Sequence, residues 1–376
     1  MAKLDALVCV LGNEEENYCK SQSLQIWLLG YELSDTLIVM AEKSVTFLAS
    51  KKKIEFLKQL EKNKNPDVPS INFLQRDKSD NDKKNFEKIQ EILKNSNNGK
   101  TLGIFSKDKD FPGPVMEGFK KISAKFETQD MSIPMAYIMA TKDDSEVSVV
   151  KKACQTTVDV FSKHLKEQIM DIIDGDKKVK HSKISEGIAN AVEDKKYNPN
   201  TDTSQLDLCY PAIIQSGGNY KLKFSVQSNE EKVHFGAIIC AFGARYKSYC
   251  SNIARTFLVN PSEKIQSIYN LLVEAEEHIL SQLKEGNKMC DVYHSTVDFV
   301  KKENAELVEK LTKNFGSVMG IEFRENSLSL APNCEAVIKK GMVFNVNIGF
   351  SGTSRRRITW ANSVKTNPLF IIHRSC

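Results

Sequence analysis

The sequence lacks the features that mark membrane and secreted proteins. It contains no run of about 18 apolar residues, the length that a helix needs to span a bilayer. It also contains no Asn-x-Ser/Thr glycosylation site with a permitted middle residue. The first residues, MAKLDALVCVLGNEEE, place Asp5 inside the apolar run and glutamates directly after it, which is unlike a signal peptide. We therefore expect a soluble, intracellular protein that binds no membrane.

The cysteines lack the spacing of a metal site or a disulfide framework. Nine cysteines are scattered through the 376 residues, and no two of them have the C-x-x-C spacing of zinc sites and redox motifs. Such a distribution is typical of reduced thiols in the cytosol or nucleus.

An excess of one charge is also missing. The chain has 53 basic and 48 acidic residues, a net charge of +5. Nucleic-acid-binding domains concentrate basic residues in a patch or stripe. The densest basic stretches are Lys51–Lys53, 176–183 and Arg355–Arg357, and none of them contains aromatic residues. Direct binding to nucleic acid is therefore expected to be weak or absent.

The first 140 residues alternate strand-like and helical patterns. Residues 36–50 predict two strands about a polar break at Glu42-Lys43, which is a hairpin signal. The periodicity further predicts helices over 52–62 (with Ile54, Leu57 and Leu60 on one face), 82–96 and 110–123, and strands over 71–76 and 100–105. This alternation predicts an α/β lobe over 1–140 with a parallel or mixed sheet.

The following residues predict an α+β lobe over 141–352. A linker, Thr141–Ser145, leads into a long helix that ends near Asp174-Gly175. A second long helix is predicted with Asn260 as its N-cap, Pro261 at its first position and Gly286 after its end. Further helices are predicted over 182–194 and 290–304, and strands over 212–218, 221–226, 233–246, 253–259 and 339–352. Residues 353–376 form a divergent tail of uncertain structure, in which Trp360 and Ile371-Ile372 are candidates for an edge strand.

Four segments of the second lobe carry a resemblance to a known fold. They are SGGNYKLKF (216–224), AFGARYKSYCSNIARTF (241–257), FGSVMGIEFRE (315–325) and KKGMVFNVNIGF (339–350). Their order and spacing resemble the pita-bread fold of methionine aminopeptidase, aminopeptidase P, prolidase and creatinase. Active members of that family use two divalent metals to activate a water molecule for attack on a peptide carbonyl.

The resemblance also implies that the catalytic groups have been replaced. The positions that match the metal-binding aspartates, histidine and first glutamate hold Ala241, Asn252, Ser317 and Asn347. The second glutamate has no counterpart before the chain ends. The two positions of assisting histidines hold Phe224 and Arg324. Because divalent metals prefer anionic oxygen and imidazole ligands, we expect no catalysis, no metal and no other cofactor.

Within this family, the chain resembles one branch, the N-terminal domain of the large subunit of the FACT histone chaperone. The resemblance covers about residues 4–352 and includes SLQIWLLGYELSDTLIV (23–39), SYCSNIARTFLVNPS (248–262) and VMGIEFRE (318–325). It implies a non-catalytic module of a nucleosome-reorganising factor that acts in transcription, replication and repair in the nucleus, on chromosomes. Core histones or histone tails are the implied partners, while the smaller FACT subunit would bind other parts of the full-length protein.

The inherited pocket is the candidate site for gripping a peptide. Gly217 and Glu322 would line it together with the replaced positions Phe224, Ala241, Asn252, Ser317, Arg324 and Asn347. Two alternatives stay open. In the first, the pocket is purely structural and the chain is an interaction module for other transcription, replication or chromatin proteins. The more remote alternative is a metal-dependent aminopeptidase.

Overall fold

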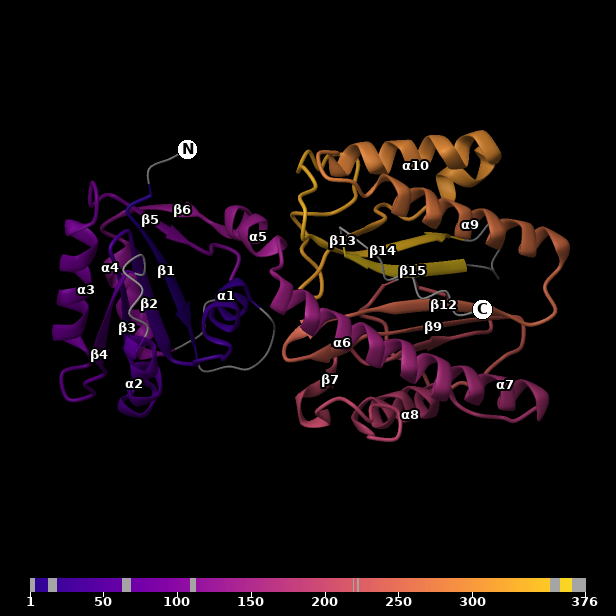
Figure 1. Cartoon of the computed structure of the whole chain (residues 1–376), viewed down its shortest axis with the longest axis horizontal. Helices are drawn as coiled ribbons and strands as arrows, with labels where there is room; N and C mark the ends of the chain where they lie inside the picture. Colours follow the sequence, from indigo (N-terminus) through magenta and orange to yellow (C-terminus); the bar gives the residue numbers. More distant parts are fainter. Residues whose placement is uncertain are drawn as a thin grey trace. The chain divides into compact units, whose positions relative to one another are not determined.

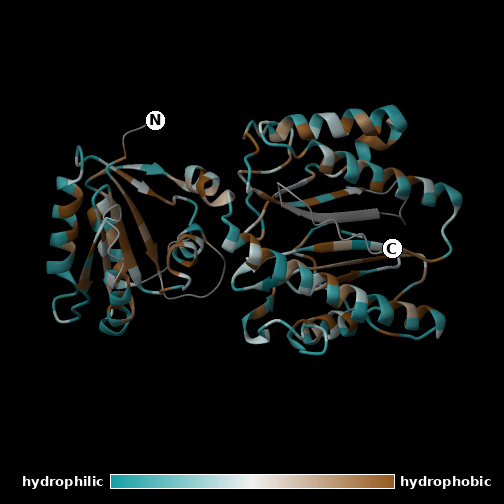
Figure 2. Cartoon of the chain, in the orientation of Figure 1, coloured by the Kyte–Doolittle hydropathy of each residue, from teal (hydrophilic) through white to brown (hydrophobic). Residues whose placement is uncertain are grey.

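A computed structural model describes residues 4–12, 19–62, 69–108, 113–218, 220–221, 223–351 and 359–366. The chain divides into two compact units, residues 1–135 and residues 136–376. Each unit builds its own core from strands covered by helices, and Figure 2 shows hydrophobic residues concentrated on the strands and the helix faces next to them. Among the described residues, no helix combines the length and the hydropathy needed to cross a membrane.

The N-terminal unit is built on a six-stranded mixed sheet with the order β4-β3-β2-β1-β5-β6 (Figure 1). Neighbours β1 and β2, and β2 and β3, are antiparallel, whereas β1–β5, β3–β4 and β5–β6 are parallel. The strands are β1 (Ala6–Leu11), β2 (Thr36–Ala41), β3 (Ser44–Ala49), β4 (Ser70–Gln75), β5 (Thr101–Ile104) and β6 (Glu127–Asp130). The helices are α1 (Lys20–Leu29), α2 (Lys51–Leu57), η1 (Lys58–Lys62), α3 (Lys83–Asn95) and α4 (Pro114–Ser123).

The sequence patterns of this unit agree with its elements. The hairpin signal at Glu42-Lys43 is confirmed, since β2 and β3 pair directly on either side of these two residues. In α2, Ile54 and Leu57 are buried as the predicted apolar face requires. Leu60 falls in the 3-10 turn η1 that continues α2, and it is only half-buried.

The C-terminal unit places its strands between two layers of helices (Figure 1). Helices α6 (Asp144–Val160), α7 (Lys166–Asp174) and α8 (His181–Glu193) lie on one side, and α9 (Glu263–Gln282) and α10 (Met289–Glu303) on the other. A π-helical turn, η2 (Phe161–Leu165), joins α6 to α7, so the predicted long helix is continuous. Its start is a capping box, in which Asp143 accepts from the Glu146 N–H and Glu146 accepts from the Asp143 N–H. The remaining helical segments are α5 (Ser132–Ala140), η3 (Thr203–Gln205) and η4 (Ala305–Lys310).

Three small sheets fill the space between these helices. Their strand orders are β11-β10-β7, β12-β9-β8 and β13-β14-β15. The strands are β7 (Leu206–Leu208), β8 (Ile213–Gln215), β9 (Ala237–Phe242), β10 (Ala244–Tyr246), β11 (Tyr249–Cys250), β12 (Ile253–Leu258), β13 (Gly316–Val318), β14 (Val343–Phe350) and β15 (Thr359–Thr366). Strands β12 and β15 lie side by side, so the second and third sheets meet there.

One predicted helix start and one predicted strand of this unit are wrong. Helix α9 begins at Glu263 with Ser262 as its N-cap, because the backbone at Asn260 is left-handed (φ 48°) and turns the chain before the helix starts. The predicted strand over 221–226 is absent from its described residues. The Lys221 N–H donates to the Gln215 side chain instead of a neighbouring strand, and the Val226 N–H closes a turn onto the Lys223 carbonyl.

The tail contributes a strand that the sequence only hinted at. Strand β15 pairs antiparallel with β14 along its whole length, and Trp360 lies opposite Gly349. The tail thus extends the third sheet. Ile371-Ile372 and Arg355–Arg357 lie outside the described residues.

Candidate functional site

Two of the sheets carry replaced ligand positions, on the central strands β9 and β14 and on the edge strand β13. Ala241 on β9 lies opposite Ala254 on β12 and Ile213 on β8, and its side chain is fully buried. Ser317 on β13 lies opposite Asn345 on β14. Both side chains are buried as well.

Asn252 joins the two sheets through its side-chain amide. It comes directly before β12 and is 4% exposed. Its Nδ2 donates to Oδ1 of Asn345 over 3.3 Å, and its Oδ1 accepts from the Tyr210 hydroxyl over 2.5 Å. Burial raises the pKa of the Tyr210 phenol well above its usual range, which further favours its neutral, proton-donating form.

Three aromatic rings pack beside these amides. The ring centroids of Tyr210, Phe224 and Phe323 lie 5.2, 5.0 and 5.0 Å from one another, with inclined or edge-on planes. Tyr210 and Phe224 also pack against the apolar group that contains Ala241. We refer to Tyr210, Phe224, Asn252, Phe323 and Asn345 as the amide–aromatic cluster. The cluster is electrically neutral, and Tyr210 links its polar half to its apolar half.

A glycine allows the closest backbone approach near the cluster. Gly316 at the start of β13 has a left-handed φ of 117°, and a Cβ at this position would lie 2.0 Å from the carbonyl oxygen of Asn345. A larger residue would push β13 away from β14. Gly316 therefore fixes Ser317 opposite Asn345.

The structure gathers some of the predicted site residues and leaves others apart. Phe224 and Asn252 belong to the amide–aromatic cluster, while Ala241 and Ser317 adjoin it through packing and strand pairing. Asn347 lies two residues beyond Asn345 on β14. Its Oδ1 is buried without a hydrogen-bond partner among the described residues.

The other three predicted residues have different surroundings. Arg324 is exposed and Glu322 half-buried, whereas Phe323 between them enters the cluster. Gly217 is exposed and left-handed (φ 83°), and a Cβ there would lie 2.8 Å from the His234 ring.

Sequence reasoning missed four residues of this region. Asn345 shares a strand face with Asn347, so the alternation in β14 was an available signal. Phe323 lies inside a segment that carries the family resemblance. Tyr210 lies in a loop without regular periodicity. Asn362 on β15 lies opposite Asn347.

Comparisons with known proteins agree with both units. Residues 1–136 match the family described as the FACT complex subunit SPT16 N-terminal lobe domain, and residues 148–367 match metallopeptidase family M24. The solved N-terminal domain of FACT complex subunit SPT16 from chickpea (Cicer arietinum) is 31% identical, with a TM-score of 0.89 over 96% of this chain and 88% of that one. The chain belongs to the SPT16 N-terminal domain family. The domain from Eremothecium gossypii is 28% identical, with a TM-score of 0.88.

The chain matches only part of its longer relatives, and its sequence identity to peptidases is low. FACT complex subunit spt-16 of Caenorhabditis briggsae is 35% identical over 353 residues, which are 92% of this chain and 34% of that protein. The chain thus spans about a third of the length of the SPT16 relatives that it matches. An X-Pro aminopeptidase from Thermotoga maritima is 14% identical, with a TM-score of 0.69 over 96% of this chain and 92% of that one. It shows the fold alone, and it confirms the expected pita-bread lobe.

The residues at the inherited positions do not fit the two-metal centre that family M24 implies. Asn252, Ser317 and Asn347 offer neutral oxygen atoms, and Ala241 offers none. Both polar atoms of the Asn252 side chain are already used within the protein. Within the described ranges, no group of three or more His, Cys, Asp or Glu side chains is placed to hold a metal ion.

Proposed function

We propose that this chain is a non-catalytic, histone-binding module of a histone chaperone. The observation that carries the proposal is the neutral amide–aromatic cluster at the positions of the peptidase centre. Asn252 bonds to Asn345 and Tyr210 there instead of to a metal. The relatives are FACT complex subunits by name, which supports a role for this chain on chromosomes in the nucleus.

The partners proposed are core histones or their basic tails. The half-buried rings of Tyr210, Phe224 and Phe323 offer apolar contact to an extended peptide without charge of their own. In this proposal the smaller FACT subunit binds other parts of the full-length protein, and DNA and membranes are not direct ligands.

Retention of histones tests this function. The immobilised chain should retain purified core histones at moderate salt, and retention should fall as salt is raised, because basic tails contribute to the contact. Failure to retain any histone, with a transcription or replication protein retained instead, would overturn the proposal.

Loss of catalysis needs a separate measurement. Purified protein should contain no stoichiometric zinc, manganese or cobalt, and peptide hydrolysis should stay at background when manganese or cobalt is added. Hydrolysis that rises with metal and is lost in Asn252→Ala would restore the aminopeptidase alternative.

A second candidate function rests on a surface of the N-terminal unit. Leu28, Tyr31 and Phe56 are 44%, 59% and 38% exposed, and the rings of Tyr31 and Phe56 meet edge-on at 5.0 Å. Paired exposed aromatic residues are typical of protein interfaces. This surface supports the alternative in which the chain binds another chromatin or replication protein.

A further inference from the structure

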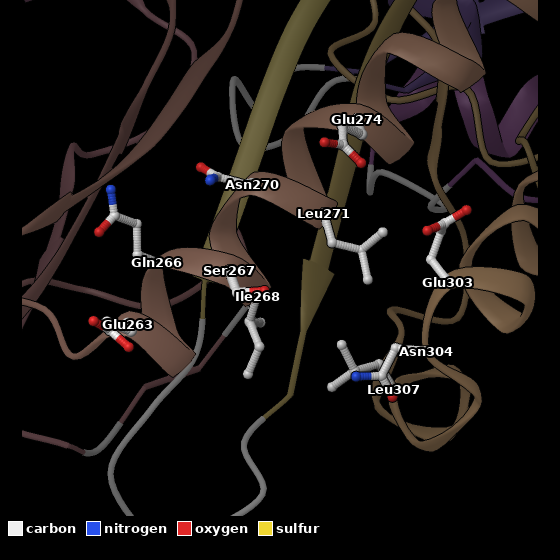
Figure 3. A pocket seen from close by; sticks show the side chains of 10 residues that line it. All are labelled: Glu263, Gln266, Ser267, Ile268, Asn270, Leu271, Glu274, Glu303, Asn304 and Leu307. Carbon is white, nitrogen blue, oxygen red and sulfur yellow. The ribbon is translucent and has the colours of Figure 1, made fainter.

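The outer helices of the C-terminal unit form a groove away from the amide–aromatic cluster. Its walls are the first half of α9 on one side, and the end of α10 with η4 on the other (Figure 3). The cavity has a volume of about 460 Å³, within the range of sites that hold small ligands or peptide side chains. We refer to it as the α9–α10 groove.

One face of α9 supplies a regular row of residues to this groove. Glu263, Ser267, Asn270 and Glu274 follow the spacing i, i+4, i+7 and i+11, which keeps them on one side of a helix. Eleven residues of helix are about 16 Å long, a span that about five residues of an extended chain would cover. The row therefore suits a short extended peptide that lies along α9.

The charged residues of the groove are all acidic. Glu263 and Glu274 on α9 and Glu303 on α10 line it, and its lining includes no lysine or arginine. These three residues are exposed. None of the three carboxylates has an ion pair or a hydrogen bond with the described residues. The groove thus carries local negative charge on a chain whose net charge is +5.

Apolar side chains cover the floor between the carboxylates. Leu271 and Ile268 from α9 point into the space between the helices, and Leu307 from η4 lies across from them (Figure 3). Leu271 and Ile268 are half-buried and Leu307 is buried, so the floor is anchored in the core of this unit. Gln266, Asn270 and Asn304 add side-chain amides that can pair with a peptide backbone.

We propose that the α9–α10 groove binds a basic, extended peptide segment, with Lys or Arg side chains at the three carboxylates and an aliphatic stem or apolar residue over Leu271. Charge complementarity selects this occupant, since the lining offers acidic and apolar surface and lacks any cation. The long side chains of lysine and arginine match it because their stems are apolar and their ends are charged. The inference rests on the proposed function, for which it names a binding surface outside the inherited peptidase positions.

The test measures binding of a fluorescein-labelled, lysine- and arginine-rich synthetic peptide to the intact chain by fluorescence anisotropy. The groove variant is Glu274→Lys with Glu303→Lys. It should weaken binding by about 10-fold or more, because two attractive pairs of up to about 1 kcal/mol each are replaced by repulsion. Binding by the original chain should weaken between 0.15 M and 1 M salt, where the Debye length falls from about 8 Å to about 3 Å.

The matched control makes the same change of charge elsewhere on the same unit. Glu285→Lys with Asp298→Lys alters two exposed acidic residues outside the groove lining, one of them also on α10. It should change affinity by less than about 2-fold. An equal loss in both variants would show diffuse attraction to the whole surface, and no loss in either would exclude the groove. Both results overturn the inference.

A third variant tests the apolar floor without changing charge. Ile268→Ala should weaken binding of the same peptide by about 3-fold, as expected for lost burial of part of one side chain. A single cooperative unfolding transition in every variant shows that the fold is intact. Retention of core histones by the original chain is measured in parallel. If the groove variant retains core histones as well as the original chain does, the groove proposal is rejected and the proposed histone function is not. If the original chain retains no histones, the proposed histone function is rejected.

Discussion

The amide–aromatic cluster and the α9–α10 groove belong to the same unit, but the cluster contains no charged side chains and the groove contains three carboxylates. The cluster has no charged member, and its Asn252 amide is bonded on both sides within the protein. The groove lies on outward helix faces, and its carboxylates have no partner among the described residues. One region satisfies its own polar groups, and the other leaves its charges open to a partner.

This difference follows from the cost of burying charge. Buried carboxylates persist where a metal or a cation compensates them, and they are costly once that partner is lost. Alanine and asparagine at positions 241 and 252 avoid this cost and turn the former ligand positions into structural contacts. Exposed carboxylates cost little, so α9 and α10 can keep unpaired charge for a partner.

Among the changes that test this comparison, Ala241→Asp is expected to have the largest effect on the free energy of unfolding. This change places a carboxylate among the apolar side chains of Ile213, Ile239 and Ala254. It should lower the free energy of unfolding by about 3–5 kcal/mol, as measured by urea denaturation. Ala305→Asp, at an exposed position, should change it by less than about 0.5 kcal/mol.

The stability of the same variant can also be measured in the presence of added metal. If the inherited positions no longer suit divalent metals, manganese should not restore the stability of Ala241→Asp. A rise in the unfolding midpoint with manganese would contradict the comparison, because binding to the folded state stabilises it by mass action. Such a result would place the cluster closer to an active peptidase than its neutral side chains indicate.

A smaller effect is expected for Asn252→Ala. The change removes two buried hydrogen bonds and leaves the Tyr210 hydroxyl and Asn345 Oδ1 without this partner. The free energy of unfolding should fall by about 1–3 kcal/mol. Asn190→Ala, an exposed residue on α8, serves as the control and should be neutral or slightly stabilising, since alanine favours helices. Equal effects of the two changes would mean that the Asn252 bonds add nothing to stability.

Much of the fold could be predicted from local patterns. The hairpin of β2 and β3, helices α3, α4, α6, α8 and α10, and strand β14 follow directly from periodicity and polar breaks. The start of α9 could not, because Asn260, Pro261 and Glu263 imitate a capping sequence while the left-handed backbone at Asn260 delays the helix to Glu263. The short strand-like run at 221–226 forms a turn because Gln215 takes up the Lys221 N–H.

The candidate site was predictable in its positions but not in its bonding. Matching segments identified Ala241, Ser317 and Asn347 on the strands that carry them and Asn252 directly before β12. The amide pair of Asn252 and Asn345 and the packing of Tyr210 with Phe323 join residues that are about 90 to 110 positions apart in sequence. No local pattern encodes such contacts. The α9–α10 groove was not predicted for the same reason, since its two walls come from separate helices.

The smallest effect is expected for stability when the groove is neutralised. Glu274→Gln with Glu303→Gln removes two exposed charges that have no partner among the described residues, so the free energy of unfolding should change by less than about 0.5 kcal/mol. Any change should be stabilising, because Glu303 is the last residue of α10 and a negative charge there opposes the helix dipole. Urea denaturation of the double variant beside the original chain checks this. A loss above about 1 kcal/mol would mean that these carboxylates already serve the fold, and the contrast between a self-satisfied cluster and a groove open to a partner would fail.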